Sequence, residues 1–304
     1  MSKRIALIVS NGRYQDKTLA RFGRPPADVG LLASILGDPS ISDFDEVDVI
    51  VDQPADVVRR HIRDLFRRRQ RYDLLLLYFA GHGLLDEDGQ LYLASSDTAP
   101  TLLEETAVAA AYVTDWMDRS FSRRQILILD CTYGQVLAPG ELCLPVDCTS
   151  MAAAFKGKGY WRAILSASDA VHYRLAGNEV QGDRESSFFT HYLIHGLETG
   201  AADRDDDGLI CVDELHAYIT DQAKAHTTGE KPHLWRYGEC DDLVIGSNTS
   251  KFEQPQPVKW DLVFGAVMAP TATLVIGGLA DLTYSIFMAV FFFLSYAFLY
   301  RFLD

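Results

Sequence analysis

Two segments of this sequence end in side chains that could cooperate in nucleophilic catalysis. Residues 74–83, LLLLYFAGHG, carry His82, and residues 126–134, ILILDCTYG, carry Cys131. Each segment begins as an apolar run typical of a strand buried on both faces of a parallel sheet, and then passes to small or polar residues. Open α/β sheets place their chemistry at the carboxyl ends of such strands. There an imidazole can accept a thiol proton and the thiolate can attack a carbonyl carbon, so the segments indicate cysteine-dependent peptide cleavage.

The elements that would position this pair alternate along the chain. The apolar runs predict strands at residues 5–9, 47–51, 74–79, 125–130 and 161–167. Helical patterns predict helices at residues 28–36, 56–69, 187–200 and 213–226. Strands that alternate with helices imply an α/β fold with a doubly wound, mostly parallel sheet and helices on both faces. His82 and Cys131 would then lie on neighbouring strand ends.

Charge and cysteine usage limit the classes of partner. The 304 residues include 28 Lys and Arg against 42 Asp and Glu, a formal net charge of −14. Such a chain repels phosphate backbones, so we expect protein partners and no nucleic acid. The five cysteines are odd in number and lack CxxC spacing, which favours neither a disulfide framework nor a zinc site and suits a reducing cytoplasm. The first apolar stretch, residues 5–9, is too short for a signal peptide.

The carboxy-terminal part has the composition of a membrane anchor. Residues 247–260 are polar and contain two prolines, which predicts an extended linker between a domain at residues 1–246 and a hairpin at 261–304. Two uncharged stretches, 262–280 and 282–299, are each long enough to cross a bilayer. One long span with an interfacial tail and a buried soluble hairpin are the alternatives. The hairpin is flanked by the cations Lys251, Lys259 and Arg301. They predict a protein of the cytoplasmic membrane whose amino-terminal domain and carboxy terminus both lie in the cytoplasm.

An acidic segment late in the chain has the spacing of a calcium-binding loop. In residues 203–214, DRDDDGLICVDE, carboxylates stand at positions 1, 3, 5 and 12, and a glycine stands at position 6. This is the spacing of an EF-hand, in which a backbone carbonyl supplies a further ligand at position 7. The alternative is an acidic cap on the following helix. The candidate Ca²⁺ ligands are Asp203, Asp205, Asp207, the Leu209 carbonyl and Glu214.

These segments together resemble the caspase-like family of clan CD cysteine peptidases, in particular its bacterial metacaspase-like branch. The resemblance spans residues 3–246 and includes the opening RIALIVSNGRYQD, the histidine strand LLLLYFAGHG and the late acidic loop with its flanking helices. It implies that His82 is the general base and that the Gly83 amide helps to form the oxyanion hole. It also implies that Asp130 lines a pocket for a basic substrate side chain. An Asp at a strand end that bonds to backbone amides is the alternative for Asp130.

The position of the nucleophile depends on how the turn is counted. The family pattern is Asp, a small residue, the catalytic Cys, two residues and Gly, whereas this chain has Asp130, Cys131, Thr132, Tyr133 and Gly134. Counting from the aspartate places the nucleophile at residue 132, and counting back from the glycine places it at residue 131. Successive strand side chains point to opposite faces, so only one of the two can face the histidine. Because the histidine is present, we predict the thiol as the nucleophile, which requires a one-residue deletion in the turn.

The sequence therefore predicts a membrane-anchored caspase-like cysteine endopeptidase that cleaves a protein substrate. The resemblance further implies cleavage after basic residues and a part in cell death or antiviral defence. One alternative is a catalytically inactive pseudoprotease that serves as a scaffold or sensor. The other is a membrane-perturbing effector whose hairpin forms a pore as a homo-oligomer, helped by small residues: Gly265, Ala266, Gly277 and Gly278.

Overall fold

The structure is a computed structural model, and it describes most of the chain up to residue 248. The described residues are 2–22, 28–137, 141–143, 153–158, 162–167, 187–226, 232–238 and 243–248. All of them belong to Met1–Phe252, the first of two units into which the chain divides; the second is Glu253–Asp304. The predicted boundary between domain and linker, at residue 246, lies close to the end of the first unit.

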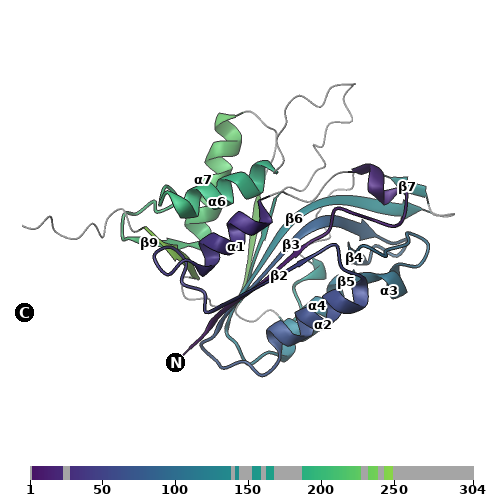
Figure 1. Cartoon of the computed structure of the whole chain (residues 1–304), viewed down its shortest axis with the longest axis horizontal. Helices are drawn as coiled ribbons and strands as arrows, with labels where there is room; N and C mark the ends of the chain where they lie inside the picture. The colour runs from purple at the N-terminus through teal and green to yellow at the C-terminus, as the bar shows by residue number, and fades with distance from the viewer. Residues whose placement is uncertain are drawn as a thin grey trace, which may run out of the picture. The chain divides into compact units, whose positions relative to one another are not determined.

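A nine-stranded sheet forms the centre of the first unit, and six of its strands form its main path in the order β10-β8-β6-β3-β1-β2 (Figure 1). Every neighbouring pair on this path is parallel except β10 with β8. This confirms the mostly parallel sheet that the alternating pattern predicts. The strands of this path are β1 Arg4–Ser10, β2 Glu46–Val51, β3 Leu74–Leu85, β6 Arg124–Leu137, β8 Arg162–Ser166 and β10 His233–Tyr237.

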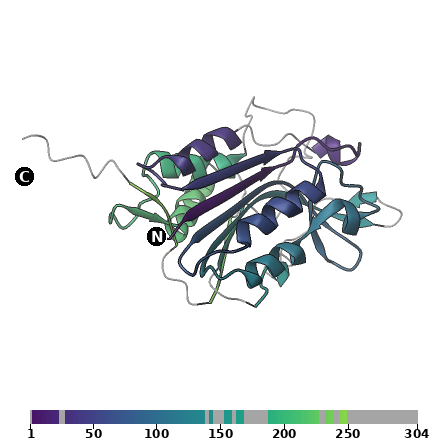
Figure 2. The ribbon, with the colours of Figure 1, turned by 60° about the horizontal axis from the view of Figure 1, so that its bottom comes forward.

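Helices cover both faces of this sheet, as Figures 1 and 2 show. On one face α1 (Val29–Gly37), α6 (Phe188–Glu198) and α7 (Val212–Ala225) bury apolar side chains against alternate residues of the strands. On the other face α2 (Ala55–Phe66) and α4 (Ala110–Arg119) pack against the intervening residues. The inner strands β1, β3, β6 and β8 therefore need apolar side chains at consecutive positions, which explains their Leu and Ile runs, whereas the edge strands β2 and β10 are more exposed.

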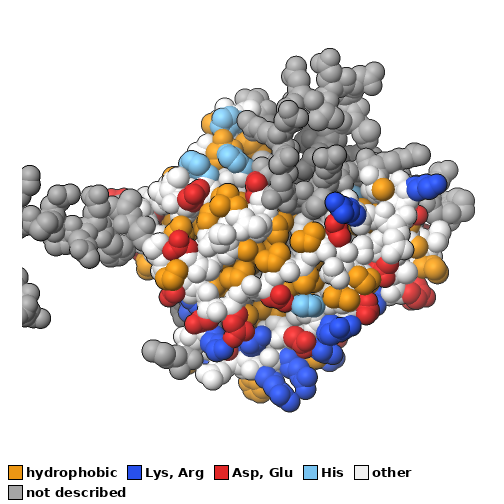
Figure 3. Space-filling model, viewed as in Figure 1, with side chains coloured by type: hydrophobic (Ala, Val, Ile, Leu, Met, Phe, Trp, Pro, Cys, Tyr) orange, Lys and Arg blue, Asp and Glu red, His pale blue; other side chains and the backbone are white. Residues whose placement is uncertain are grey.

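The sequence pattern of helix α2 determines which of its sides packs against the sheet. Val58, Ile62 and Phe66 recur at four-residue spacing and are buried against the sheet. The arginines that alternate with them face outward, and Figure 3 shows Lys and Arg side chains gathered over the region of this helix. Arg60 and Arg63 form exposed ion pairs with Asp56 and Asp64. The predicted charged face is present, and such exposed pairs contribute little to stability.

The two long central strands continue past their predicted ends. Small strands pair with their extensions: β4 (Leu91–Ala94) with β3, and β7 (Glu141–Cys143) with β6. The remaining elements are η1 (Leu19–Phe22), α3 (Leu103–Thr106), β5 (Ala107–Ala109), and β9 (Leu209–Cys211), which pairs with β11 (Val244–Ser247). His82 and Cys131 consequently lie within paired strands rather than at strand ends.

No helix in the described part of the chain is both long and apolar enough to span a bilayer. The predicted spans at residues 262–280 and 282–299 lie outside the described residues.

Candidate active site

The register of β3 against β6 decides which side chains can meet at the predicted site. The two strands pair in parallel over twelve consecutive positions without a bulge, with Gly81 opposite Cys131 and His82 opposite Thr132. Partners in register point to the same face of a sheet, and successive residues point to opposite faces. Position 132 therefore lies on the face of His82, and Cys131 lies on the other face.

The Cys131 thiol is part of the hydrophobic core beside α2 and α4. Its residue is 9% exposed and belongs to one cluster with Leu127, Leu129 and Tyr133. Its Sγ lies 3.9 Å from the carbonyl oxygen of Phe79. Apolar surroundings disfavour the thiolate, which is the nucleophilic form. The structure thus places Cys131 one register position away from the partner of His82, and the action of the two residues as nucleophile and base stays a prediction.

His82 is held by a tyrosine that the sequence pattern left without a role. Tyr14, which follows β1, stacks on the imidazole with ring centroids 4.9 Å apart. Its hydroxyl accepts a hydrogen bond from the backbone N–H of His82 at 3.3 Å and donates to the Asn11 carbonyl at 2.8 Å. The signal for this contact was present in the opening segment, where Tyr14 follows the small-residue turn after the first strand.

Burial sets the protonation state of His82. The residue is 7% exposed, and desolvation lowers the pKa of His82 to about 4, against a smaller opposing effect of a backbone hydrogen bond to Leu19. The imidazole is therefore neutral at pH 7 and can accept a proton, but it is a weak base. Desolvation also raises the pKa of the neighbouring Tyr14, so its hydroxyl stays protonated.

Gly83, the predicted oxyanion donor, lies inside the sheet. It pairs with Leu93 on β4 and with Tyr133 on β6, so it is not at a free strand end. A Cβ atom at this position would lie 2.3 Å from Cδ1 of Tyr133. The close approach of that ring gives a structural reason for glycine here. Its role in an oxyanion hole stays a prediction.

Asp130, the predicted specificity residue, joins the sheet to helix α6. Its Oδ2 accepts hydrogen bonds from the hydroxyls of Ser187 and Thr190 in the first turn of the helix, and from Tyr78 at 3.4 Å. Desolvation raises the pKa of Asp130, and these hydroxyl donors partly oppose the shift. The Asp130 carboxylate thus holds helix α6 against the sheet. Its donors are side-chain hydroxyls, whereas the alternative interpretation of Asp130 expects backbone amides as donors. A contact to a basic substrate remains a prediction.

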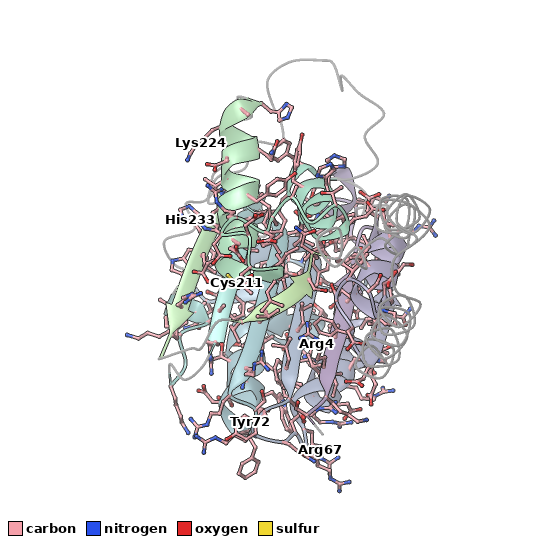
Figure 4. The ribbon with its side chains drawn as sticks, turned by 90° about the vertical axis from the view of Figure 1, so that its left-hand side faces the viewer. Arg4, Arg67, Tyr72, Cys211, Lys224 and His233 are labelled. Atoms are coloured by element: carbon pink, nitrogen blue, oxygen red, sulfur yellow. The ribbon has the colours of Figure 1, made fainter. Side chains whose placement is uncertain are left out.

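Three of the predicted calcium ligands lie together. Asp203, Asp205 and Glu214 offer carboxylate oxygens that all lie within 4.8 Å of one another. Asp207 instead accepts a hydrogen bond from the Leu209 N–H at 2.7 Å. Gly208 has a φ of +87°, the conformation that the sharp turn of such a loop requires. Figure 4 shows Cys211 of this loop at the start of α7.

Carboxylate oxygens in this loop fit the preference of Ca²⁺ for hard ligands. In the structure they accept hydrogen bonds from the loop backbone, including Glu214 Oε1 from the Arg204 N–H at 2.8 Å and Oε2 from the Cys211 N–H at 2.9 Å. Although partial burial opposes the change, these donors hold the pKa of Glu214 below its ordinary value. The Glu214 carboxylate is therefore ionised at neutral pH, as a cation ligand must be.

Comparison with known proteins agrees with the architecture. Residues 3–143 match the family model of the caspase domain, a range that contains His82, Asp130 and Cys131. The match supports a caspase-like, cysteine-peptidase class for this part of the chain and does not identify catalytic residues. None of the curated proteins matches the sequence.

A solved structure shares the fold over most of the chain. A crystal structure of a protein from Geobacter sulfurreducens superposes with a TM-score of 0.52 and 14% sequence identity, over 81% of this chain and 97% of that one. At this identity the likeness concerns the fold alone.

Proposed function

We propose that this protein is a caspase-like pseudopeptidase, a domain that keeps the peptidase fold and histidine but acts as a scaffold or sensor. The observation that carries the proposal is the unbroken pairing of β3 with β6, which sets Thr132 opposite His82 and turns Cys131 toward the α2 face. A thiolate is needed on the face of the histidine for cysteine-peptidase chemistry. Position 132 supplies only a hydroxyl group.

The chemistry of the histidine agrees with this interpretation. A hydroxyl is a weak nucleophile unless a positioned base removes its proton. Burial holds the pKa of His82 at about 4, which makes it a weaker base than an ordinary imidazole. A poor nucleophile paired with a weak base supports binding or signalling rather than turnover.

The second candidate is the cysteine endopeptidase that uses Cys131 as nucleophile and His82 as base. It is favoured by the close sequence match of the histidine segment and by the position of Cys131, which pairs with the residue next to His82. A shift of β6 by one residue would exchange the two faces. The caspase domain match supports this class as well.

Peptide labelling separates the two candidates. We expect that an arginine-directed electrophilic peptide labels neither the wild-type chain nor Cys131→Ala, and that peptides ending in Arg or Lys are hydrolysed only at the background rate. Iodoacetamide after denaturation serves as the control that the thiol is intact. Labelling of the native protein at Cys131 that His82→Ala abolishes would establish the endopeptidase and refute the pseudopeptidase.

We also propose that residues 262–299 anchor the protein as a two-span hairpin with the amino-terminal domain in the cytoplasm. The support is the length of the two uncharged stretches and the flanking cations Lys251, Lys259 and Arg301. The small residues of the hairpin would permit a homo-oligomer. The full chain should remain in the membrane pellet after an alkaline carbonate wash; its release into the supernatant would refute the anchor.

The acidic loop is proposed to bind Ca²⁺ through Asp203, Asp205 and Glu214, with Asp207 and the Leu209 carbonyl completing the set. We expect calcium to raise the melting temperature of the full chain, because a ligand at a hundredfold excess over its Kd stabilises the folded state by about 2.7 kcal/mol. Glu214→Gln should remove that response. Glu87→Gln, which removes an equal charge from an exposed turn, should keep it. An unchanged calcium response in Glu214→Gln would leave the loop as a helix cap.

A further inference from the structure

A cavity of about 580 Å³ lies at the end of the sheet opposite to His82, where β6 and β8 begin. Figure 4 labels Tyr72 and Arg67 at this end of the unit, far from Lys224 on α7. The walls come from the turn before β3, the end of α4 and the segment that enters β6. Its charged lining residues are Arg71, Asp118, Arg119, Arg123, Lys158 and Arg162.

The charge of this lining is the reverse of the charge of the whole chain. Five of the lining residues are basic and one is acidic, whereas the protein carries a net charge of −14. Asp118 is already paired with the buried Arg162, and Arg119 pairs with Asp115 outside the lining. The side chains of Arg71 and Lys158 form no ion pair with any residue in the described part of the chain. The cavity wall therefore attracts anions.

The inner wall also contains polar atoms that protein groups leave unsatisfied. Gln125 is 2% exposed, and its Nε2 donates to the carbonyl oxygens of Met117 and Ser122, each at 3.0 Å. These bonds orient its Oε1 as an acceptor, and among the described residues this atom has no hydrogen-bond donor. Arg162 is 1% exposed, and its Nε likewise has no hydrogen-bond acceptor among the described residues. Each of these atoms needs a partner that the described protein groups do not supply, such as a water molecule or a polar group of a ligand.

An exposed aromatic ring completes the lining. Phe121 is 78% exposed, the largest exposure among the described large apolar side chains. It lies between Arg119 and Arg123 in sequence, and all three contribute to the cavity wall. An aromatic face beside cations is the combination on which a nucleobase stacks while its phosphate is neutralised.

We propose that this cavity binds a nucleoside monophosphate. Its phosphate would lie against Arg71, Arg123 and Lys158, because guanidinium and ammonium groups form charge-assisted hydrogen bonds with phosphate oxygens. The base stacks on Phe121. The volume of the cavity is in the range of pockets that hold small organic ligands. The proposed site does not depend on the proposed pseudopeptidase function. The length of the central strands separates the cavity from His82.

Calorimetric titration of the full chain with AMP tests this site. We expect saturable binding by the wild type and a loss of affinity of about tenfold or more in the double variant Arg123→Glu/Lys158→Glu, because each substitution replaces a charge-assisted contact by repulsion. The matched control is Arg67→Glu/Arg68→Glu, which changes the net charge equally at exposed positions outside the cavity and should bind AMP as the wild type does. Phe121→Ala should weaken AMP binding and leave the response to inorganic phosphate unchanged.

Three results would overturn the proposal. One is the absence of saturable AMP binding to the folded wild-type chain. Another is an equal loss of AMP binding in the cavity variant and in the Arg67/Arg68 control, which would indicate attraction by the overall basic surface. The third is equal affinity for AMP and inorganic phosphate, which would leave the nucleoside without a contact.

Discussion

Thr132→Cys is expected to make this chain reactive toward an arginine-directed electrophilic peptide. The substitution places a cysteine at the position that pairs in register with His82. The imidazole is neutral, so it can accept the thiol proton and generate the thiolate. A well-matched general base contributes roughly 10²–10⁴-fold to rate, but burial lowers the pKa of His82 to about 4 and weakens it as a base, so we expect labelling of Thr132→Cys to exceed that of Thr132→Cys/His82→Ala by only about tenfold.

The chain supplies its own matched control for this experiment. Cys131 precedes the substituted position by one residue but belongs to the cluster on the opposite face. Mass spectrometry of the labelled protein should therefore locate the adduct at residue 132 and not at residue 131, and Cys131→Ala should not alter the rate. A folded Thr132→Cys protein that resists labelling would show that His82 is not placed to act as a base.

Asp118→Asn is expected to cost about 3–5 kcal/mol in the free energy of unfolding, the range for removing one partner of a buried ion pair. Arg162 is 1% exposed, and its guanidinium pairs with the Asp118 carboxylate, whose side chain is 11% exposed. The same carboxylate accepts a hydrogen bond from the Lys158 N–H at 2.9 Å. Replacement by the isosteric amide leaves a buried guanidinium without its counter-charge, whereas the shape of the side chain is retained.

Urea denaturation measures this effect, and Asp115→Asn is its control. Asp115 lies on the same helix and pairs with Arg119, but both side chains of that pair are about two-thirds exposed, at 67% and 65%. Exposed pairs of this type contribute about 0–1 kcal/mol, so the control should unfold close to the wild-type midpoint. Equal midpoints for Asp118→Asn and Asp115→Asn would mean that solvent reaches Arg162 and that the pair is not buried.

Local residue patterns were sufficient to predict the main elements. The runs that became β1, β3, β6 and β8 are apolar at consecutive positions, and only a strand covered on both faces satisfies such a run. The four-residue spacing of Val58, Ile62 and Phe66 predicted the buried side of α2. Helix α4 was missed. The short strands β4, β5, β7, β9, β10 and β11 were missed as well, because short segments carry little periodic signal.

The arrangement of residues around the candidate site depends on contacts between distant segments. Counting along residues 130–134 left two positions for the nucleophile, since a deletion in a turn cannot be distinguished from a substitution in a single sequence. Continuous hydrogen-bonded pairing with β3 fixes the face of each residue, and it turns Cys131 into the core. Asp130 likewise bonds to hydroxyls 57 and 60 residues further along the chain, at the start of α6.

The sequence by itself therefore determined which residues form the buried strands and most of the helices that cover them, because these properties follow from the spacing of apolar side chains. Tertiary structure alone decided which polar groups meet. Strand register and the docking of α6 depend on the whole sheet being assembled. A shift of one residue leaves the apolar pattern of a doubly covered strand almost unchanged, but it moves every polar side chain at the site to the opposite face.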